Sequence, residues 1–520
     1  MTHVRLRLIA PLLVLASWLL LVGPMDASAF QLFRTEEASI DDIQAALQAR
    51  TLTCRALVQM YLDRIEAYDK KGPALNAIVA INADALKTAD ALDAKLAQSG
   101  PTGPLHCVPI IVKDNYDTVD MPTSAGSLSL KGSMPPRDAF QVRKLREAGA
   151  IMLAKANMAE FAFDPFETVG SLLPGYTRNP YALERVTAGS SGGTAAAVAA
   201  SFGAVGLGTD TGNSIRGPAS HTSLVGIRST MGLTSRDGIV PLFLDKDIGG
   251  PMARTVADAV AIFDVIAGYD PADAVTAASQ GKRPDSYLQS LVKDGVQGAR
   301  LGVVRQLFTP QNTDPEVMQR MEQALADLRR LGAQVVDPIH VAEIDDIPPP
   351  TLFCIRFKFD INDYLARLGP AAPVKNLEEI IKSTKFHPSI EKRLIDRQAE
   401  PPLAENQRCL KAAENGQRLR DALQKAMDDT RLDALVYPTW AFPPRLIGDL
   451  NTPHGNNSPR LSPPTGFPAI TVPMGFVRDT LPVGLQVLGR AWSEPTLIKI
   501  VYGYEQATRH RRPPASTPPL

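Results

Sequence analysis

Apolar and polar positions divide the chain into amphipathic helices and short buried strands. Apolar residues that recur every three or four positions predict helices, whereas the continuous apolar run Val108–Val112 predicts a strand buried on both faces. The predicted helices cover residues 39–50, 53–69, 83–98, 138–148, 255–267, 315–331 and 494–509. The predicted strands cover residues 76–81, 108–112, 150–154, 300–304, 333–336, 434–437, 469–472 and 483–488. Since strands and helices alternate, we expect one large α/β domain, whose central twisted, mixed and largely parallel sheet is covered by helices on both faces.

Three further segments depart from this alternation. Residues 348–424 have helical periodicity without strands, which predicts a helical insertion or lid. Residues 157–167 are rich in aromatic side chains and are expected to form a loop that walls a pocket. Residues 229–248 are also expected to be a loop.

The N-terminus has the pattern of a secretory signal peptide. Two arginines precede the apolar run Leu8–Val22, and Ala27-Ser28-Ala29 supplies the small residues of a cleavage site. The apolar run has about 15 residues, whereas a membrane-spanning helix needs roughly 20. We therefore expect a signal peptide over residues 1–29, cleavage after Ala29 and a mature catalytic domain over residues 30–520. The protein would be periplasmic or secreted, without stable membrane insertion; an uncleaved membrane anchor is the alternative.

Composition narrows the possible partners. The 55 basic residues balance the 55 acidic ones, and no cluster of lysine and arginine stands out. This balance argues against a nucleic-acid partner, because such partners require a basic surface. The 520 residues are enough to bury a large core, and the 43 prolines indicate many rigid loops.

The four cysteines leave two interpretations open. Cys54, Cys107, Cys354 and Cys409 are an even number, and an oxidising compartment would permit two disulfides among three possible pairings. Four buried free thiols are the other interpretation. Neither a Cys-x-x-Cys motif nor a histidine cluster indicates a metal site, so no metal is expected.

The segment Thr187–Pro218 concentrates the candidate chemistry. Two serine-bearing loops, Gly189–Gly193 and Thr209–Ser214, flank an alanine-rich helix, and their small side chains let the backbone approach a ligand closely. A helix is expected to start at Ser214, where unpaired N–H groups would stabilise an alkoxide and an oxyanion. A helix cap is the ordinary alternative for a serine in this position.

A serine nucleophile needs a base, and the sequence offers three arrangements. Ser191 lies in a Gly-x-Ser-x-Gly pattern typical of α/β-hydrolases, although residues 179–188 form a poor strand to precede it. His221 follows Ser214 by seven residues, on the same face of a helix. Lys113 ends a predicted buried strand, where desolvation would lower its pKa and make the neutral amine available.

Six motifs together resemble the amidase signature family. They are VPIIVKDN (108–115), AGSSGG (188–193), GTDTGNSIRGP (208–218), GGPMART (249–255), PAITVPMGF (468–476) and LPVGLQVLGR (481–490). The resemblance implies that Ser214 attacks the acyl carbon, while Ser190, which follows a cis peptide bond, relays a proton between Ser214 and neutral Lys113. It also implies an oxyanion hole built from the backbone N–H groups of Thr211, Gly212, Asn213 and Ser214.

The resemblance assigns supporting roles as well. Ser191 would orient Lys113, while Asp210 and Arg216 would brace the loops, and neither a metal nor an organic cofactor is needed. Asn213 stands where the family usually has glycine, and Arg228-Ser229 stands where Lys-Pro is common. Aromatic and apolar side chains near the site are candidate pocket residues, although they are equally plausible in the core: Met158, Phe161, Phe163, Phe166 and Tyr116.

The expected function is therefore that of an exported amidase, active as a monomer or homodimer on a small-molecule amide, with esters and carbamates as further candidate substrates. An apolar or aryl acyl group is the expected substrate feature. Three alternatives are an α/β-hydrolase-type esterase that uses Ser191 and a histidine, a component of a tRNA-dependent amidotransferase, and a catalytically inactive binding protein.

Overall fold

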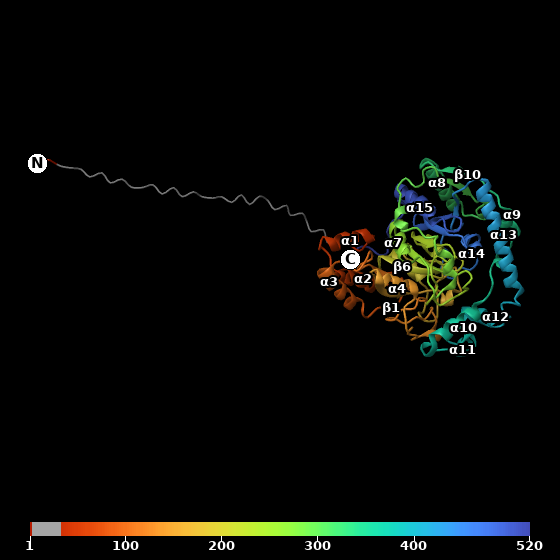
Figure 1. Ribbon diagram of the computed structural model, residues 1–520, viewed down its shortest axis with the longest axis horizontal. Coiled ribbons are helices and arrows are strands. Elements are labelled where there is room, and N and C mark those ends of the chain that lie inside the picture. The colour runs from red at the N-terminus through yellow and green to blue at the C-terminus, as the bar shows by residue number, and fades with distance from the viewer. Residues whose placement is uncertain (3–32) are drawn as a thin grey trace. The chain divides into compact units, whose positions relative to one another are not determined.

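An eleven-stranded mixed sheet organises the protein, which we describe from a computed structural model (Figure 1). Its strand order is β1-β3-β2-β6-β8-β7-β12-β13-β11-β9-β10. The structure describes residues 1–2 and 33–520, and residues 34–520 form one compact unit. The predicted signal sequence and its cleavage site at Ala29 lie outside these described residues.

The strands of this sheet largely match the apolar runs. They are β1 (Ile78–Ile81), β2 (Pro109–Lys113), β3 (Ile151–Ala156), β6 (Val205–Asp210), β7 (Val225–Arg228), β8 (Ile248–Ala253), β9 (Arg300–Val303), β10 (Gln334–Val336), β11 (Ala434–Pro438), β12 (Ala469–Val477) and β13 (Leu481–Leu488). Parallel pairing joins β3-β2-β6 and β11-β9-β10, whereas β8, β7, β12 and β13 run antiparallel to their neighbours. The parallel arrangement expected for the sheet therefore describes these two blocks and not the strands between them.

Helices surround the sheet, and several of them contact it directly. They are α1 (Ile40–Gln48), α2 (Cys54–Tyr68), α3 (Ala85–Ser99), α4 (Phe140–Glu147), α5 (Gly192–Ala199), α6 (Arg216–His221), α7 (Val256–Ile266), α8 (Pro315–Arg330), α9 (Ala342–Asp346), α10 (Phe357–Leu368), α11 (Leu377–Ser383), α12 (Glu391–Gln398), α13 (Gln407–Asp429), α14 (Ser462–Thr465) and α15 (Glu494–Thr508). Helices α5 and α6 contact each other and the sheet, while α7 contacts α4 and α15, and α15 contacts α8. The expected α/β domain with helices on both faces is thus confirmed.

Local capping explains where several helices begin. Ser39 and Asp42 form a reciprocal capping box at the start of α1. Thr53 and Thr255 cap α2 and α7 by accepting hydrogen bonds from backbone N–H groups of the first turn. Asp314 caps α8 immediately before Pro315, which suits the first helical position because it has no N–H to satisfy.

The sequence pattern missed three strands of the central sheet, β6, β7 and β8, and both strands of a separate hairpin. β7 and β8 contain arginine, or glycine and proline, in place of a continuous apolar run, so they carry little strand signal. Residues 182–186, within the segment considered a poor strand, form β5, which pairs only with β4 (Arg178–Asn179) in a separate hairpin. The loop expected over residues 229–248 extends to residue 247, where β8 takes over.

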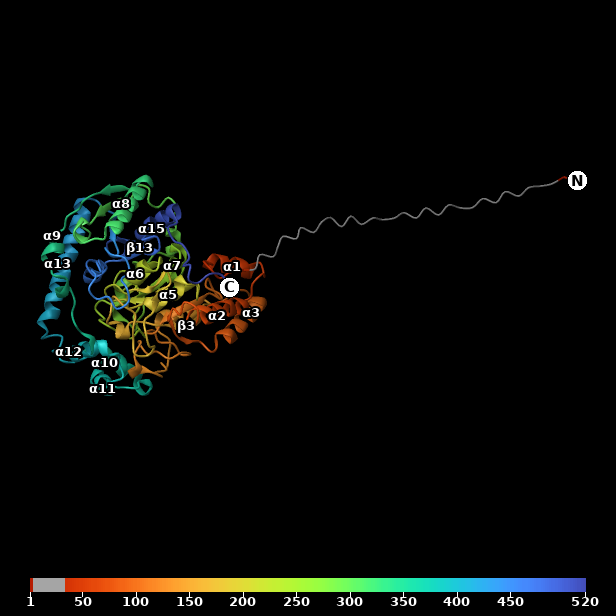
Figure 2. The same cartoon turned by 180° about the vertical axis from the view of Figure 1, so that it is seen from behind.

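Residues 348–424 form helices, as their periodicity predicts, and the last of these helices continues to Asp429. In Figure 1 and in Figure 2 alike, α10, α11 and α12 lie together while α13 runs along the periphery. A disulfide between Cys354 and Cys409 ties the segment before α10 to the first turn of α13. That this region acts as an insertion or lid stays a prediction.

A second disulfide joins Cys54, at the start of α2, to Cys107, just before β2. The two bonds select one of the three possible pairings, and all four cysteines are used. No helix within residues 33–520 combines the length and the apolar character that crossing a membrane requires.

Residues near the C-terminus pack against α2. The buried guanidinium of Arg64 donates hydrogen bonds to the carbonyl oxygens of Thr517 and Pro518, each at 3.0 Å, and forms an ion pair with Glu36. The hydroxyl of Tyr68 donates to the same Pro518 carbonyl at 2.9 Å. These contacts satisfy an arginine that is 1% exposed, which would otherwise be a costly buried charge.

Candidate active site

Lys113 ends β2 inside the protein, next to the end of β6. The two strands are parallel and pair Val112 with Leu207, so Lys113 reaches the region of Thr209. Its Nζ is hydrogen-bonded to the hydroxyls of Ser190 and Thr209, at 2.7 Å each. Burial lowers the pKa of Lys113 from 10.5 to about 7, although the carboxylates of Asp247 and Asp210 oppose this shift. A neutral amine is therefore available near neutral pH.

Ser190 approaches Lys113 from a tightly packed turn before α5. The Gly189–Ser190 peptide bond is cis, as the family resemblance implied. The chain around Thr168 passes so close to this turn that a Cβ atom at Gly192 would lie 2.1 Å from the Thr168 hydroxyl. Only glycine fits this position, because such a contact would displace the turn that carries Ser190.

Ser191, which the resemblance expects to orient Lys113, is connected to it through Thr209. The Ser191 hydroxyl donates to the Thr209 carbonyl at 3.2 Å and accepts from the Thr209 N–H at 3.3 Å. Thr209 in turn contacts the amine of Lys113 at 2.7 Å. Thr209 lies in the GTDTGNSIRGP motif, but nothing in the local sequence indicated a contact with Lys113.

The same bonds leave Ser191 badly placed as a nucleophile. Its side chain is fully buried, and among the hydrogen bonds of residues 33–520 none joins it to a histidine. His221 is buried with its ring 4.5 Å from that of Trp440, and burial lowers its pKa to about 3. The arrangement expected for an α/β-hydrolase-type esterase is therefore not formed.

Ser214 lies at the end of a loop, residues 211–214, that connects β6 to α6. Helix α6 starts at Arg216 rather than at the expected Ser214, and it has only six residues. The N–H groups of Ile215 and Arg216 donate to the Asp210 carboxylate at 3.2 and 3.4 Å, so they are not free for an oxyanion. Donors for an oxyanion would therefore come from residues 211–214 themselves.

Asp210 anchors this loop through two arginines. Its carboxylate forms ion pairs with Arg216 at 2.9 Å and with Arg228 at 3.2 Å, and all three side chains are fully buried. Burial alone would raise the pKa of Asp210, but the two guanidinium groups lower it to about 2. Arg216 also donates to the Gly212 carbonyl at 2.9 Å, so the expected brace between Asp210 and Arg216 is present, and Arg228 extends it.

A cavity of about 370 Å³ opens beside Ser214 and the loop that precedes it. Its walls are mostly apolar: Ala162, Phe163, Pro165, Phe166, Leu242, Phe243, Pro349, Phe353 and Pro459. Polar side chains of His454, Asn456 and Arg460 also line it. The cavity is of the size and character of small-molecule sites.

Of the five candidate pocket residues, Phe163 and Phe166 line the cavity, whereas the other three lie in the core, the alternative that the sequence left open. Met158 and Phe161 are fully buried in the hydrophobic cluster behind the cavity, where the Phe161 ring lies 5.6 Å from that of Phe357. Tyr116 donates its hydroxyl to the Gly208 carbonyl at 2.7 Å and supports β6. Local spacing cannot distinguish a wall residue from the residue packed behind it.

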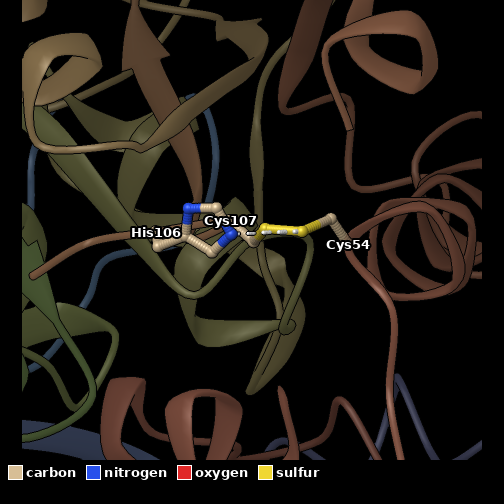
Figure 3. A group of neighbouring side chains, drawn as sticks. All are labelled: Cys54, His106 and Cys107. Carbon is tan, nitrogen blue, oxygen red and sulfur yellow. Dashed lines mark hydrogen bonds between the residues drawn. A yellow bond between two sulfur atoms is a disulfide. The ribbon is translucent and has the colours of Figure 1, made fainter. Parts of the chain in front are cut away.

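A potential metal-ligand cluster lies elsewhere, next to the first disulfide (Figure 3). One ligand atom each of Cys54, His106 and Cys107 lies within 4.8 Å of the others, an arrangement that the sequence spacing did not suggest. The two sulfur atoms are bonded to each other, so they are not the thiolates that a metal ion would need. The cluster is therefore a packed disulfide with a histidine beside it.

Comparisons with known proteins show which family the chain belongs to. The family model described as Amidase matches residues 56–498. A probable amidase of Arabidopsis thaliana is 35% identical over 97% of both chains, and a glutamyl-tRNA(Gln) amidotransferase chain of Acinetobacter baumannii is 35% identical over 90% of this chain and 96% of its own. Among solved structures, the peptide amidase of Stenotrophomonas maltophilia is 38% identical, with a TM-score of 0.84 over 92% of this chain and 98% of its own. The chain thus belongs to the amidase signature family and is an amidohydrolase of linear amides.

Proposed function

We propose that the protein is an exported amidase that cleaves linear amides through a serine acyl-enzyme, with Ser214 as nucleophile, Ser190 as proton relay and Lys113 as base. The observation that carries this proposal is the contact between the buried amine of Lys113 and the hydroxyl of Ser190, at 2.7 Å, across 77 residues of sequence. An amine with a pKa of about 7 accepts and returns a proton near neutral pH.

Acylation begins when Ser214 attacks the amide carbon. Its proton passes to Ser190, whose own proton passes to neutral Lys113. The negative charge that develops on the carbonyl oxygen is stabilised by backbone N–H groups of residues 211–214. Collapse of the tetrahedral intermediate breaks the C–N bond, and Lys113 returns the proton through Ser190 to the leaving amine.

Deacylation uses the same groups in the same order. Water attacks the acyl-enzyme, gives one proton through Ser190 to Lys113, and forms a second tetrahedral intermediate. The C–O bond to Ser214 then breaks, the proton returns to the Ser214 oxygen, and the carboxylic acid leaves. Atoms and charges balance without a further reactant.

The substrate we favour has an aromatic or apolar acyl group. Five side chains of the cavity beside Ser214 supply this preference: Phe163, Phe166, Leu242, Phe243 and Phe353. Peptide amides that end in an aromatic residue combine such a group with a linear amide, and the similarity to a peptide amidase supports this class.

Export is supported by the N-terminal sequence pattern and by the two disulfides, which persist in oxidising compartments. Fractionation of expressing cells, followed by N-terminal sequencing of the mature protein, tests it. A chain beginning at Phe30 outside the cytoplasm is expected. An uncleaved chain in the cytoplasm would contradict export.

The catalytic roles are tested by single substitutions. Ser214→Ala, Ser190→Ala and Lys113→Ala should each abolish hydrolysis of an aromatic peptide amide. His221→Gln should lower it far less, because His221 packs against Trp440 and is hydrogen-bonded to neither hydroxyl. A fluorophosphonate should label Ser214, as identified by peptide mass. Activity retained in Ser214→Ala would refute the assignment. Glutamine hydrolysis that depends on added Glu-tRNA(Gln) and partner chains would instead favour the amidotransferase function named for the relatives.

A further inference from the structure

The side chain of Asn213 connects the two serine loops. Its Nδ2 donates to the carbonyl oxygens of Gly189 at 2.9 Å and Pro165 at 3.2 Å. Its Oδ1 accepts from the indole N–H of Trp440 at 3.0 Å. Asn213 is 2% exposed, so these bonds are shielded from water.

These partners fix the orientation of the amide. Carbonyl oxygens only accept and an indole N–H only donates, so Nδ2 must face Gly189 while Oδ1 faces Trp440. Trp440 is itself held in place, with its ring 4.5 Å from that of His221 and 6.2 Å from that of Phe166. An aspartate at position 213 would place a carboxylate oxygen against two carbonyl oxygens.

The surrounding backbone leaves room for this side chain. A Cβ atom at Gly217, in the first turn of α6, would lie 2.2 Å from Oδ1 and 2.5 Å from Nδ2 of Asn213. Glycine at position 217 is therefore required by the asparagine amide. The amide of Asn213 thus faces the Gly189 carbonyl and the Trp440 indole N–H.

We propose that Asn213 is a positioning residue that sets the spacing between the hydroxyls of Ser214 and Ser190, with Trp440 fixing the orientation of its amide. Asn213 directly precedes Ser214, and the carbonyl of Gly189 belongs to the peptide unit that leads into Ser190. One neutral side chain thus joins both halves of the relay. Proton transfer requires heavy atoms within about 2.6–3.2 Å, so a small displacement of either loop would slow both acylation and deacylation.

The proposal rests on the proposed function and predicts a loss in kcat rather than in KM. Asn213→Gly and Asn213→Asp should lower kcat for an aromatic peptide amide by about 100-fold, the cost of a displacement of about 1 Å, with little change in KM. Labelling of Ser214 by a fluorophosphonate should slow in parallel. The matched control is Asn179→Gly. Asn179 is fully buried and also donates to two backbone carbonyls, of His221 and Val186, but it joins no serine loop.

Trp440→Phe separates positioning from folding, because it keeps the ring and removes the N–H donor. It should lower kcat by less than Asn213→Gly, and the double variant should lose no more than Asn213→Gly alone, since both changes act through one amide. The proposal would be overturned if Trp440→Phe kept the wild-type kcat, or if Asn179→Gly and Asn213→Gly lost the same amount of kcat. If Asn213→Gly fails to fold, the kcat of Trp440→Phe alone tests the proposal. Activity retained in Ser190→Ala would instead overturn the proposed function.

Discussion

Moving the pH from 5 to 9 should titrate the buried amine of Lys113 and the activity with it. The pKa of this amine falls from 10.5 to about 7 on burial, so charging it inside the protein costs about 5 kcal/mol more than charging it in water. Only the neutral amine accepts a proton from Ser190. With a pKa of about 7, about one tenth of the molecules are neutral at pH 6 and about nine tenths at pH 8.

The assay is kcat/KM for an aromatic peptide amide without ionisable groups, so that the profile reports the free enzyme alone. We expect a rise with unit slope on the acid side, a midpoint near pH 7 and a plateau above pH 8. Because the substrate does not ionise, its titration cannot cause the rise in kcat/KM on the acid side.

A substitution at Asp247 tests the same reasoning through the pH dependence of kcat/KM. Its carboxylate favours the charged form of Lys113 and accepts hydrogen bonds from the Thr211 hydroxyl at 2.5 Å and the Leu242 N–H at 2.8 Å. Asp247→Asn keeps an acceptor oxygen but removes the charge, so the pKa of Lys113 should fall and the midpoint should move to lower pH. A flat profile between pH 5 and 9 in the wild type, or a midpoint that does not move in Asp247→Asn, would refute the reasoning.

Three further outcomes follow from buried groups and from the second disulfide. Lys113→Met should raise the free energy of unfolding by about 3 kcal/mol more at pH 6 than at pH 9, because the native amine resists protonation below its unfolded pKa; urea unfolding at both values measures this difference, and an equal effect at both would contradict it. Arg228→Met should lower the free energy of unfolding at pH 7 by about 3–5 kcal/mol, since the Asp210 carboxylate loses one of two buried partners, and a loss below about 1 kcal/mol would contradict that role. Cys354→Ser should raise KM for aromatic amides more than it lowers kcat, because the disulfide holds the residue next to Phe353, which lines the cavity. Steady-state kinetics with an aromatic and an aliphatic amide measure this effect. Equal changes for both substrates would contradict this prediction.

The fold was predictable where a local pattern coincided with burial. β2 reads Pro-Ile-Ile-Val-Lys, with four apolar residues before the buried lysine, and each of its bounds was expected within one residue. β8 reads Ile-Gly-Gly-Pro-Met-Ala and contains little of what predicts a strand, yet it is fully buried between β6 and β7. Its strand conformation follows from those two neighbours, which no local window of sequence contains.

The residues of the candidate site also differ in whether the local sequence indicates their role. Lys113 and Ser190 were expected to meet only through the family resemblance, because periodicity cannot bring together residues 77 positions apart. Thr209 and Phe353 escaped notice, since each gains its role from a contact with a distant segment. The same limit applied to Asn213, whose side-chain direction depends on Trp440.

The contact between Arg64 and residues 517 and 518 has a consequence for biosynthesis. These carbonyl oxygens are the last partners of a guanidinium that belongs to the second helix of the unit. During synthesis, about 450 residues must be added after Arg64 before residues 517 and 518 are made. This takes on the order of half a minute at typical elongation rates. Until then Arg64 lacks these two hydrogen bonds, so the packing of α2 is completed only near the end of synthesis.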